Sequence, residues 1–248
     1  MALVTEAEAR PDAVPPHPDG RRARGDSTRR AILAASMRLA SAEGLQDLSI
    51  ARLAGELGMS KSGLFAHFGS KEELQLSTVR AARRVFSDEA VTPALAAKKG
   101  IERLDALLAA WHEYITNELF PGGCLLMEAA AEFDNRPGAV RDLVAETMAM
   151  WMGLLVEQAV RALERGELAP GTDPAQLAWE LHAFGLALNW DFQLNGPGPA
   201  RERAAAAVRA RLEAAASAKG RKRLAKTTGA TAPAVAYPPA PHLGGRPP

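Results

Sequence analysis

The sequence predicts an all-α fold, and three observations favour it. Between about residues 28 and 216, apolar side chains recur at helical spacing, with little of the alternation that a strand requires. Alanine, leucine, glutamate and arginine, which favour helices, dominate this stretch. Glycine, proline and serine interrupt it where caps and turns are expected. We expect about nine helices, which form a small three-helix N-terminal domain and a larger helical domain after it.

The composition is that of a globular protein, with 248 residues, 47% hydrophobic and 24% charged. Such a chain is too apolar to be wholly disordered, and it has no run of eighteen uninterrupted apolar residues to span a membrane. Its single cysteine excludes a disulfide framework within the chain. We therefore expect a cytoplasmic protein with no membrane partner, no metal and no cofactor.

The net charge of +1 hides an uneven distribution. Residues 1–20 carry −3, residues 21–85 carry +6, residues 86–215 carry −8, and residues 216–248 carry +6. A basic segment beside an acidic body is a reason to consider a polyanionic partner at one end of the chain.

Composition also suggests the domain boundaries. We expect a disordered arm over residues 1–24, a first domain over 25–85, a second over 86–216, and a disordered basic tail over 217–248. The arm is proline-rich and lacks apolar periodicity, and the tail passes from lysine and arginine into threonine, alanine, proline and glycine.

Capping residues define the helices of the first domain. Gly44 supplies a left-handed C-cap, Ser49 and Ser60 are placed to cap two short helices, and Ser70 with Glu73 forms a capping box. The three helices are expected at about 28–43, 50–57 and 61–67, and a longer fourth helix follows at about 71–88.

The second domain is punctuated by proline and glycine. Thr92-Pro93 interrupts the helical pattern, and Asp173 followed by Pro174 is a good N-cap and N1 pair. The five helices are expected at about 98–119, 124–133, 137–165, 174–194 and 200–216.

The most informative segment is residues 49–68, where two short helices meet at a glycine. A steep crossing requires a small residue on the first helix and a turn residue that tolerates positive φ, and Ala54 and Gly58 meet these needs. Leu64 is spaced to seal the second helix onto the first. This pattern is typical of a helix-turn-helix, which presents the start of its second helix to the major groove of DNA.

The residues at the presented surface agree with a DNA partner. Ser60, Lys61 and Ser62 are small or cationic, so the helix N-terminus can approach phosphates and place Lys61 near base edges. Lys71 begins a helix, where the helix dipole disfavours a cation unless a phosphate lies nearby. Ser49 is placed to bind a second phosphate.

Residues 28–76, and residues 60–74 above all, resemble the DNA-binding domain of TetR-family transcriptional regulators. The residues at the family's spacing are Gly44, Ala54, Gly58, Gly63, His67, Phe68, Lys71 and Leu74. The resemblance implies an all-helical homodimer with three helices for DNA, a ligand-binding body, and dimerisation through the last two helices.

The candidate DNA-binding residues are Ser49, Arg52, Ser60, Lys61, Ser62, Gly63, Leu64, Phe65, His67 and Lys71. Two positions depart from the family pattern: Phe65 stands where a tyrosine is common and lacks its hydroxyl, and Ala51 stands where many members carry a base-reading arginine. Direct readout is then expected from Lys61, Ser62 and the arm. The arginines of the arm, which either enter the minor groove or stay solvated, are Arg21, Arg22, Arg24 and Arg29.

The second domain holds all four tryptophans and a group of methionines, which suit an adaptable apolar cavity or an ordinary core. The candidate pocket residues are Trp111, Tyr114, Met127, Phe133, Met148, Trp151, Met152 and His182. We expect His112 and His182 to be satisfied interior histidines. Cys124 begins a helix, which would lower the pKa of its thiol, although no second cysteine is available to resolve an oxidised form.

The helix at 174–194 is apolar on two sides, as a dimer-interface helix would be, and the last helix is small-sided. The candidate interface residues are Trp179, Ala183, Leu186, Val208 and Leu212.

The leading hypothesis is a ligand-responsive repressor that binds a palindromic operator as a homodimer and releases it when a small apolar or amphipathic effector binds. An architectural or activating DNA-binding protein without an effector is an alternative, which a solid core in the body would support. An all-helical enzyme is the remaining class, but the sequence offers no catalytic grouping of Ser, His and Asp, paired carboxylates or phosphate-binding loop.

Overall fold

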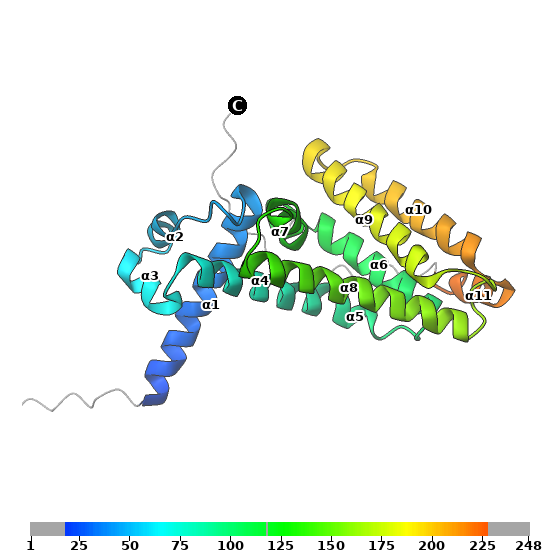
Figure 1. The fold of residues 1–248 in the computed structure, drawn as a ribbon, viewed down its shortest axis with the longest axis horizontal. Coiled ribbons are helices and arrows are strands. Elements are labelled where there is room, and N and C mark those ends of the chain that lie inside the picture. Colours follow the sequence, from blue (N-terminus) through cyan, green and yellow to red (C-terminus); the bar gives the residue numbers. More distant parts are fainter. Residues whose placement is uncertain (1–17, 118, 228–248) are drawn as a thin grey trace, which may run out of the picture.

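The computed structural model describes residues 18–117 and 119–227, with side chains from Ala23 onward. In these residues the chain is helical, apart from loops and one isolated bridge between Leu168 and Ala216. Figure 1 shows a small group of helices at one end and a longer helical bundle that extends away from it.

The small domain comprises α1 (Pro18–Glu43), α2 (Ile50–Glu56) and α3 (Lys61–Phe68), and α4 (Lys71–Phe86) packs on it. Ile32, Leu53, Leu64 and Leu74 are almost completely buried and form the centre of this unit. Their burial supplies the apolar contact that short helices need, since helices of seven or eight residues are not stable alone.

The chain stays helical beyond α4 as far as Ala94, before turns at residues 95–100 lead into the body. After α4 the chain continues through a π-helical turn, η1 (Ser87–Val91), into the short α5 (Thr92–Ala94). The break expected at Thr92-Pro93 is therefore absent. Pro93 lies at the start of α5, directly after the π-helical turn.

The large domain is formed by α6 (Ile101–Thr116), α7 (Leu125–Phe133), α8 (Ala139–Glu164), α9 (Pro174–Asn195) and α10 (Ala200–Ala215). α6 lies at its centre and packs on α8, α9 and α10, whereas α7 packs on α8 and reaches α1 and α4. α7 is thus the helix of the body that touches the small domain, together with α8 along α4.

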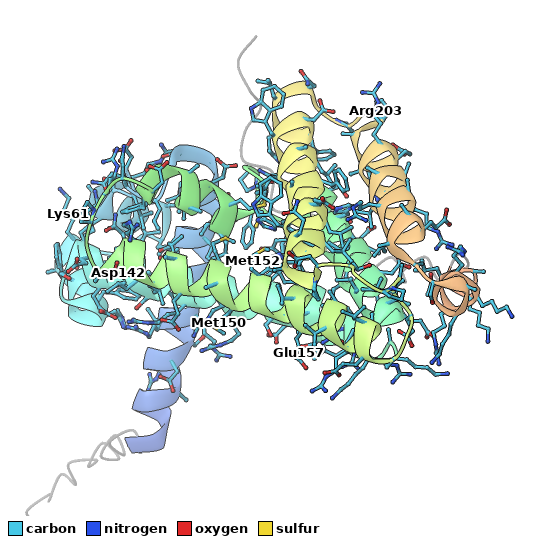
Figure 2. The ribbon with its side chains drawn as sticks, turned by 45° about the vertical axis from the view of Figure 1, so that its right-hand side comes forward. Lys61, Asp142, Met150, Met152, Glu157 and Arg203 are labelled. Carbon is cyan, nitrogen blue, oxygen red and sulfur yellow. The ribbon has the colours of Figure 1, made fainter. Side chains whose placement is uncertain are left out.

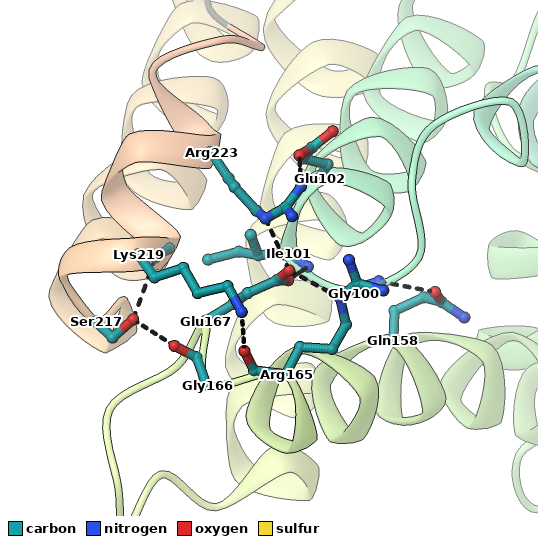
Figure 3. Close-up of polar contacts among 11 residues, drawn as sticks. Gly100, Ile101, Glu102, Gln158, Arg165, Gly166, Glu167, Ser217, Lys219 and Arg223 are labelled. Carbon is teal, nitrogen blue, oxygen red and sulfur yellow. Dashed lines mark hydrogen bonds and ion pairs between the residues drawn. The ribbon is translucent and has the colours of Figure 1, made fainter.

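A further helix, α11 (Ala218–Leu224), lies inside the segment expected to be a disordered tail. It is held by the buried carboxylate of Glu167, which accepts hydrogen bonds from the guanidinium groups of Arg165 (2.9 Å) and Arg223 (3.0 Å). Arg223 also pairs with Glu102 at 2.6 Å, and Glu167 accepts from the backbone of Ile101 at 3.1 Å (Figure 3). The expectation of a tail without structure is therefore wrong for residues 218–224, because distant acids bind its cations.

The remaining helices lie where the sequence places them, with one long extension. α1 begins at Pro18, inside the expected arm, so the prediction of disorder over residues 1–24 is wrong from residue 18 onward. Ser70 caps α4 as expected, but the Glu73 carboxylate pairs with Arg80 and accepts from the Ser77 hydroxyl.

By length and composition alone, α8 would pass as a membrane span, with a mean hydropathy of 1.3 over its most apolar window. One such helix is weak evidence for a membrane protein. In this fold α8 packs along α4, α6, α7 and α9.

Two helical glycines provide a matched test of core packing. A Cβ at Gly185 of α9 would overlap the Trp111 ring, whereas a Cβ at the exposed Gly153 of α8 would meet nothing within 4 Å. We expect Gly185→Ala to lower the free energy of unfolding by about 1–3 kcal/mol through overpacking. Gly153→Ala should raise it by about 0.5–1 kcal/mol, since alanine favours helices. Urea denaturation of both variants measures the two changes; a neutral Gly185→Ala would contradict the close α6–α9 contact.

Candidate functional site

The helix-turn-helix is built by two serine caps and one glycine. The Ser49 hydroxyl accepts from the Arg52 amide at 3.4 Å, and the Ser60 hydroxyl accepts from the Gly63 amide at 3.0 Å. Gly58 adopts φ +63° between the two helices, a conformation that favours glycine. Ala54 is buried at the crossing, as expected.

α3 presents a small, cationic surface to solvent. Ser60, Lys61, Ser62 and Phe65 are exposed, and Figure 2 shows Lys61 at the end of the molecule opposite Arg203. Leu64, however, is completely buried, so the prediction that it contacts DNA is wrong: its side chain seals α3 onto the small domain's core. Gly63 and His67 are partly buried beside it.

The two other predicted cations are already engaged within the chain. Arg52 pairs with Glu43 at 2.6 Å. Lys71, at the start of α4, donates from Nζ to the Gln46 carbonyl at 2.5 Å. This bond connects α4 to the loop before α2. Both side chains remain exposed.

Arg29 is not part of an arm that is free to bind DNA. Its guanidinium donates to the His67 carbonyl at 2.5 Å and to the Ser77 hydroxyl at 3.0 Å, and it lies 4.3 Å from the centre of the Phe68 ring. The expectation for Arg29 is therefore wrong, because it joins α1 to α3 and α4. Arg24 lies in the exposed first turns of α1, and the side chains of Arg21 and Arg22 lie outside those that the structure describes.

The turn at Leu45 and Gln46 is bound by helices of both domains. The Glu132 carboxylate of α7 accepts from the backbone amides of Leu45 at 2.7 Å and Gln46 at 2.9 Å. The carbonyl groups of the same two residues accept from Gln75 and Lys71 of α4. Gly44 makes this possible, since it adopts φ +95° and a Cβ there would lie 2.8 Å from the Glu132 carboxylate.

The other end of α7 is held by α9. The Asn189 side chain is buried; its carbonyl accepts from the Cys124 amide at 3.1 Å, and its amide donates to Glu128 at 3.0 Å. α7 is therefore fixed at one end to α9 and at the other to the small domain.

Aromatic side chains cluster between α4, α6, α8 and α9. Trp111 stacks on His182 with ring centres 5.0 Å apart, and Trp151 donates to His182 Nδ1 at 3.3 Å. Phe86, which the sequence reasoning missed, meets both Trp151 and Tyr114 edge to face.

A cavity of about 20 Å³ lies within this cluster. Four of the expected pocket residues line it: Trp111, Met127, Met148 and Trp151. Tyr114, Phe133, Met152 and His182 do not line it; Tyr114 and Phe133 are buried in the core, and His182 lies behind Trp111. Its remaining lining comes from Phe86, Cys124, Leu126 and Thr147.

Burial shifts the pKa of three titratable groups in the body toward the neutral form. Burial lowers the pKa of His112 to about 4, and its Nε2 has no hydrogen-bond partner among the described residues, so the expectation of a satisfied histidine is wrong there. Burial also lowers the pKa of His182. Burial raises the pKa of Cys124 to about 11, which overturns the expectation that its helix position lowers it. Among the described residues, no three His, Cys, Asp and Glu side chains gather as metal ligands would.

The expected interface residues divide into two groups. Trp179 and Leu186 of α9 are exposed, and Ala183 is partly exposed. Val208 and Leu212 of α10 are buried within the chain, so the prediction that they face a partner is wrong. Sequence reasoning missed Trp190 and Leu194, although both continue the helical spacing of Trp179 and Leu186.

Cys124 provides a direct test of the site's environment. With its thiol buried and its pKa near 11, almost none of it is thiolate at pH 8, and we expect native protein to resist alkylation by iodoacetamide. Alkylation should become rapid in denaturant. Mass spectrometry before and after unfolding measures this, and modification of native protein within minutes would contradict the burial.

Comparisons with known proteins agree with this architecture. Residues 32–77 match the family described as bacterial regulatory proteins, tetR family, and residues 100–208 match the family described as tetracyclin repressor-like, C-terminal domain. No curated protein sequence matches the chain.

Several solved structures share the fold at low sequence identity. A TetR transcriptional regulator from Chloroflexus aurantiacus is 22% identical, with a TM-score of 0.70, 75% of this chain covered and 94% of the other. A putative regulator from Saccharomonospora viridis in complex with choline is 22% identical, with a TM-score of 0.66 and coverage of 76% and 96%. AibR, in complex with isovaleryl coenzyme A and operator DNA, is 21% identical, with a TM-score of 0.57 and coverage of 71% and 93%.

The two family matches fall on the two structural parts in turn, the helix-turn-helix and the helical body. The chain therefore belongs to the TetR family of DNA-binding transcriptional regulators.

Proposed function

We propose that this protein is a cytoplasmic, ligand-responsive repressor that binds a palindromic operator as a homodimer. The observation that carries the proposal is the bond between Glu132 and the Leu45 and Gln46 amides, since α7 also lines the cavity in the body. A ligand that displaces α7 would shift the small domain, and so the spacing of two recognition helices that ideally lie about 34 Å apart.

On the DNA side, the exposed start of α3 supports a division of roles. Lys61 and Ser62 have no bond to another element among the described residues, so they are free to read base edges. Lys71, Ser49 and Arg52 lie at helix starts and suit phosphate contacts. Phe65, at 43% exposure, offers apolar contact, as with a thymine methyl group.

The dimer is proposed to form through α9. Trp179, Leu186, Trp190 and Leu194 are 62%, 44%, 66% and 65% exposed and follow one stripe along the helix. A contiguous apolar stripe of this kind is typical of an interface between copies. Val208 and Leu212 contribute indirectly, because they pack α10 against the chain's own core.

The lining of the cavity indicates the effector's chemistry. Its side chains are apolar apart from Thr147 and Cys124, and no carboxylate or cation reaches it. An uncharged apolar or aromatic group fits this lining, and Met127 and Met148 are flexible enough to widen it. AibR and the S. viridis regulator, which have this fold, are solved with an acyl coenzyme A and with choline.

The volume of the cavity favours a second candidate, a DNA-binding regulator without an effector. About 20 Å³ holds little more than one water molecule. A thermal-shift screen of small apolar ligands separates the two candidates: a ligand that stabilises the protein and weakens operator binding supports the repressor, and a protein that no ligand stabilises supports the second.

Two lysines test the assignment of the DNA surface. Lys61→Ala should weaken operator binding and also change which sequence is preferred, by about 1–3 kcal/mol at the affected base pair. Lys71→Ala should weaken binding to all sequences alike. It should also lower the slope of log affinity against log salt by about one, as expected for the loss of one phosphate contact. Titrations on specific and scrambled duplexes at two salt concentrations measure both, and equal losses for the two variants would contradict the role given to Lys61.

Glu132 tests the connection between the domains. Glu132→Ala should expose the Leu45 and Gln46 amides to rapid hydrogen exchange, because they lose their acceptor. It should also weaken operator binding about tenfold, because the small domain loses its fixed orientation. Glu132→Gln should cause smaller changes in both exchange and binding. Glu157→Gln is the control, since Glu157 is exposed and forms only a surface pair with Arg161. Unchanged exchange at Leu45 and Gln46 would show that the junction does not depend on Glu132.

A further inference from the structure

A groove of about 330 Å³ runs between α1 and α4 and is lined by four arginines, Arg29, Arg30, Arg80 and Arg84. Asp26 is the single carboxylate in its lining, so the charge of the lining is +3. Such a concentration of guanidinium groups within the small domain differs from the mixed charges of an ordinary solvated surface.

The four arginines are not equally engaged. Arg29 is fixed by the His67 carbonyl and the Ser77 hydroxyl, and Arg80 pairs with Glu73 at 3.0 Å. Arg30 and Arg84 have no ion pair within residues 18–117 and 119–227; Arg30 makes one long bond, 3.4 Å, to the Asp26 carbonyl. Asp26 is thus the one carboxylate of the lining beside two arginines that form no ion pair within the described residues.

The chemistry of the groove selects the anion. Guanidinium is planar and offers paired N–H donors, which match the oxygen atoms of phosphate. Leu33 and Ala81 supply apolar surface to the same lining. The hydroxyl of Ser77, at the same groove, accepts from Arg29 and donates to Glu73, so it helps to hold Arg29 in place.

We propose that this α1–α4 groove binds a phosphate group through Arg30 and Arg84, with Arg29 and Arg80 as the supporting cations. The phosphate comes either from the backbone of DNA that flanks the operator or from a soluble phosphorylated ligand. The groove adjoins the end of α3, because Arg29 bonds to the His67 carbonyl. The proposal depends on neither the effector nor the operator proposed above.

The test uses the full-length protein with the double variant Arg30→Ala/Arg84→Ala. One arm measures affinity for a long duplex of scrambled sequence against salt concentration, and the other measures binding of inorganic pyrophosphate by calorimetry. Arg136→Ala removes the same kind of exposed arginine from the body and is the control. Both groove side chains are exposed, so thermal unfolding should confirm that the variants fold.

If the phosphate belongs to DNA, the double variant lowers the slope of log affinity against log salt by up to about two, and pyrophosphate does not bind. If it belongs to a soluble ligand, wild-type protein binds pyrophosphate, the double variant does not, and the DNA slope stays unchanged. Asp26→Asn should strengthen whichever binding is observed, because it removes the opposing charge. A double variant that matches Arg136→Ala in both arms would overturn the proposal.

Discussion

The arrangement of the two domains depends on one carboxylate. Glu132 forms no ion pair within the part of the chain that the structure describes; its carboxylate accepts hydrogen bonds from two backbone amides of a turn that lies 86 and 87 residues earlier. Buried amides without an acceptor are costly, and bonds to a charged acceptor are among the stronger ones in proteins. Since α4 takes both carbonyl groups of the same turn, Leu45 and Gln46 have all their backbone polar groups bound by two other elements. The small domain therefore has one favoured orientation on the body.

α7 is short, and that makes it suited to transmit a displacement. Its first residues line the cavity and bond to Asn189, while its last turn carries Glu132. If this nine-residue helix shifts as a rigid body, Glu132 moves with it. Any ligand that prefers one position of α7 must favour one position of the small domain, and by linkage DNA must favour the same position of α7.

Local signals in the sequence were sufficient to predict most helices and the helix-turn-helix. Ser49, Ser60 and Gly58 cap or terminate helices through contacts with residues only a few positions away in the chain. Features that depend on distant partners were not predictable. In the sequence, Glu132 is one polar residue of an ordinary helix, and only the folded structure shows which turn it binds. Likewise Leu212 was expected to face a partner, but it is buried by helices of its own chain that pack on it. α1 begins ten residues before the expected start because arginine and alanine favour helices even without an apolar stripe.

Segment charges can be interpreted only once their partners are known. Arg223 of α11 belongs to a strongly basic segment, but it pairs with Glu102 and Glu167, and α11 lies at the far end of the body from α3 (Figure 1). Those two carboxylates neutralise the charge of Arg223 and hold α11 in place. Because Glu167 is buried, breaking its ion pair would leave an unpaired buried charge, which is costly in free energy. Arg30 and Arg84 have no such partners in the described chain and line the α1–α4 groove, where Arg29 bonds to the carbonyl of His67 at the end of α3. Equal positive sums therefore have different consequences: one fastens a terminal helix, and the other is left to attract an anion.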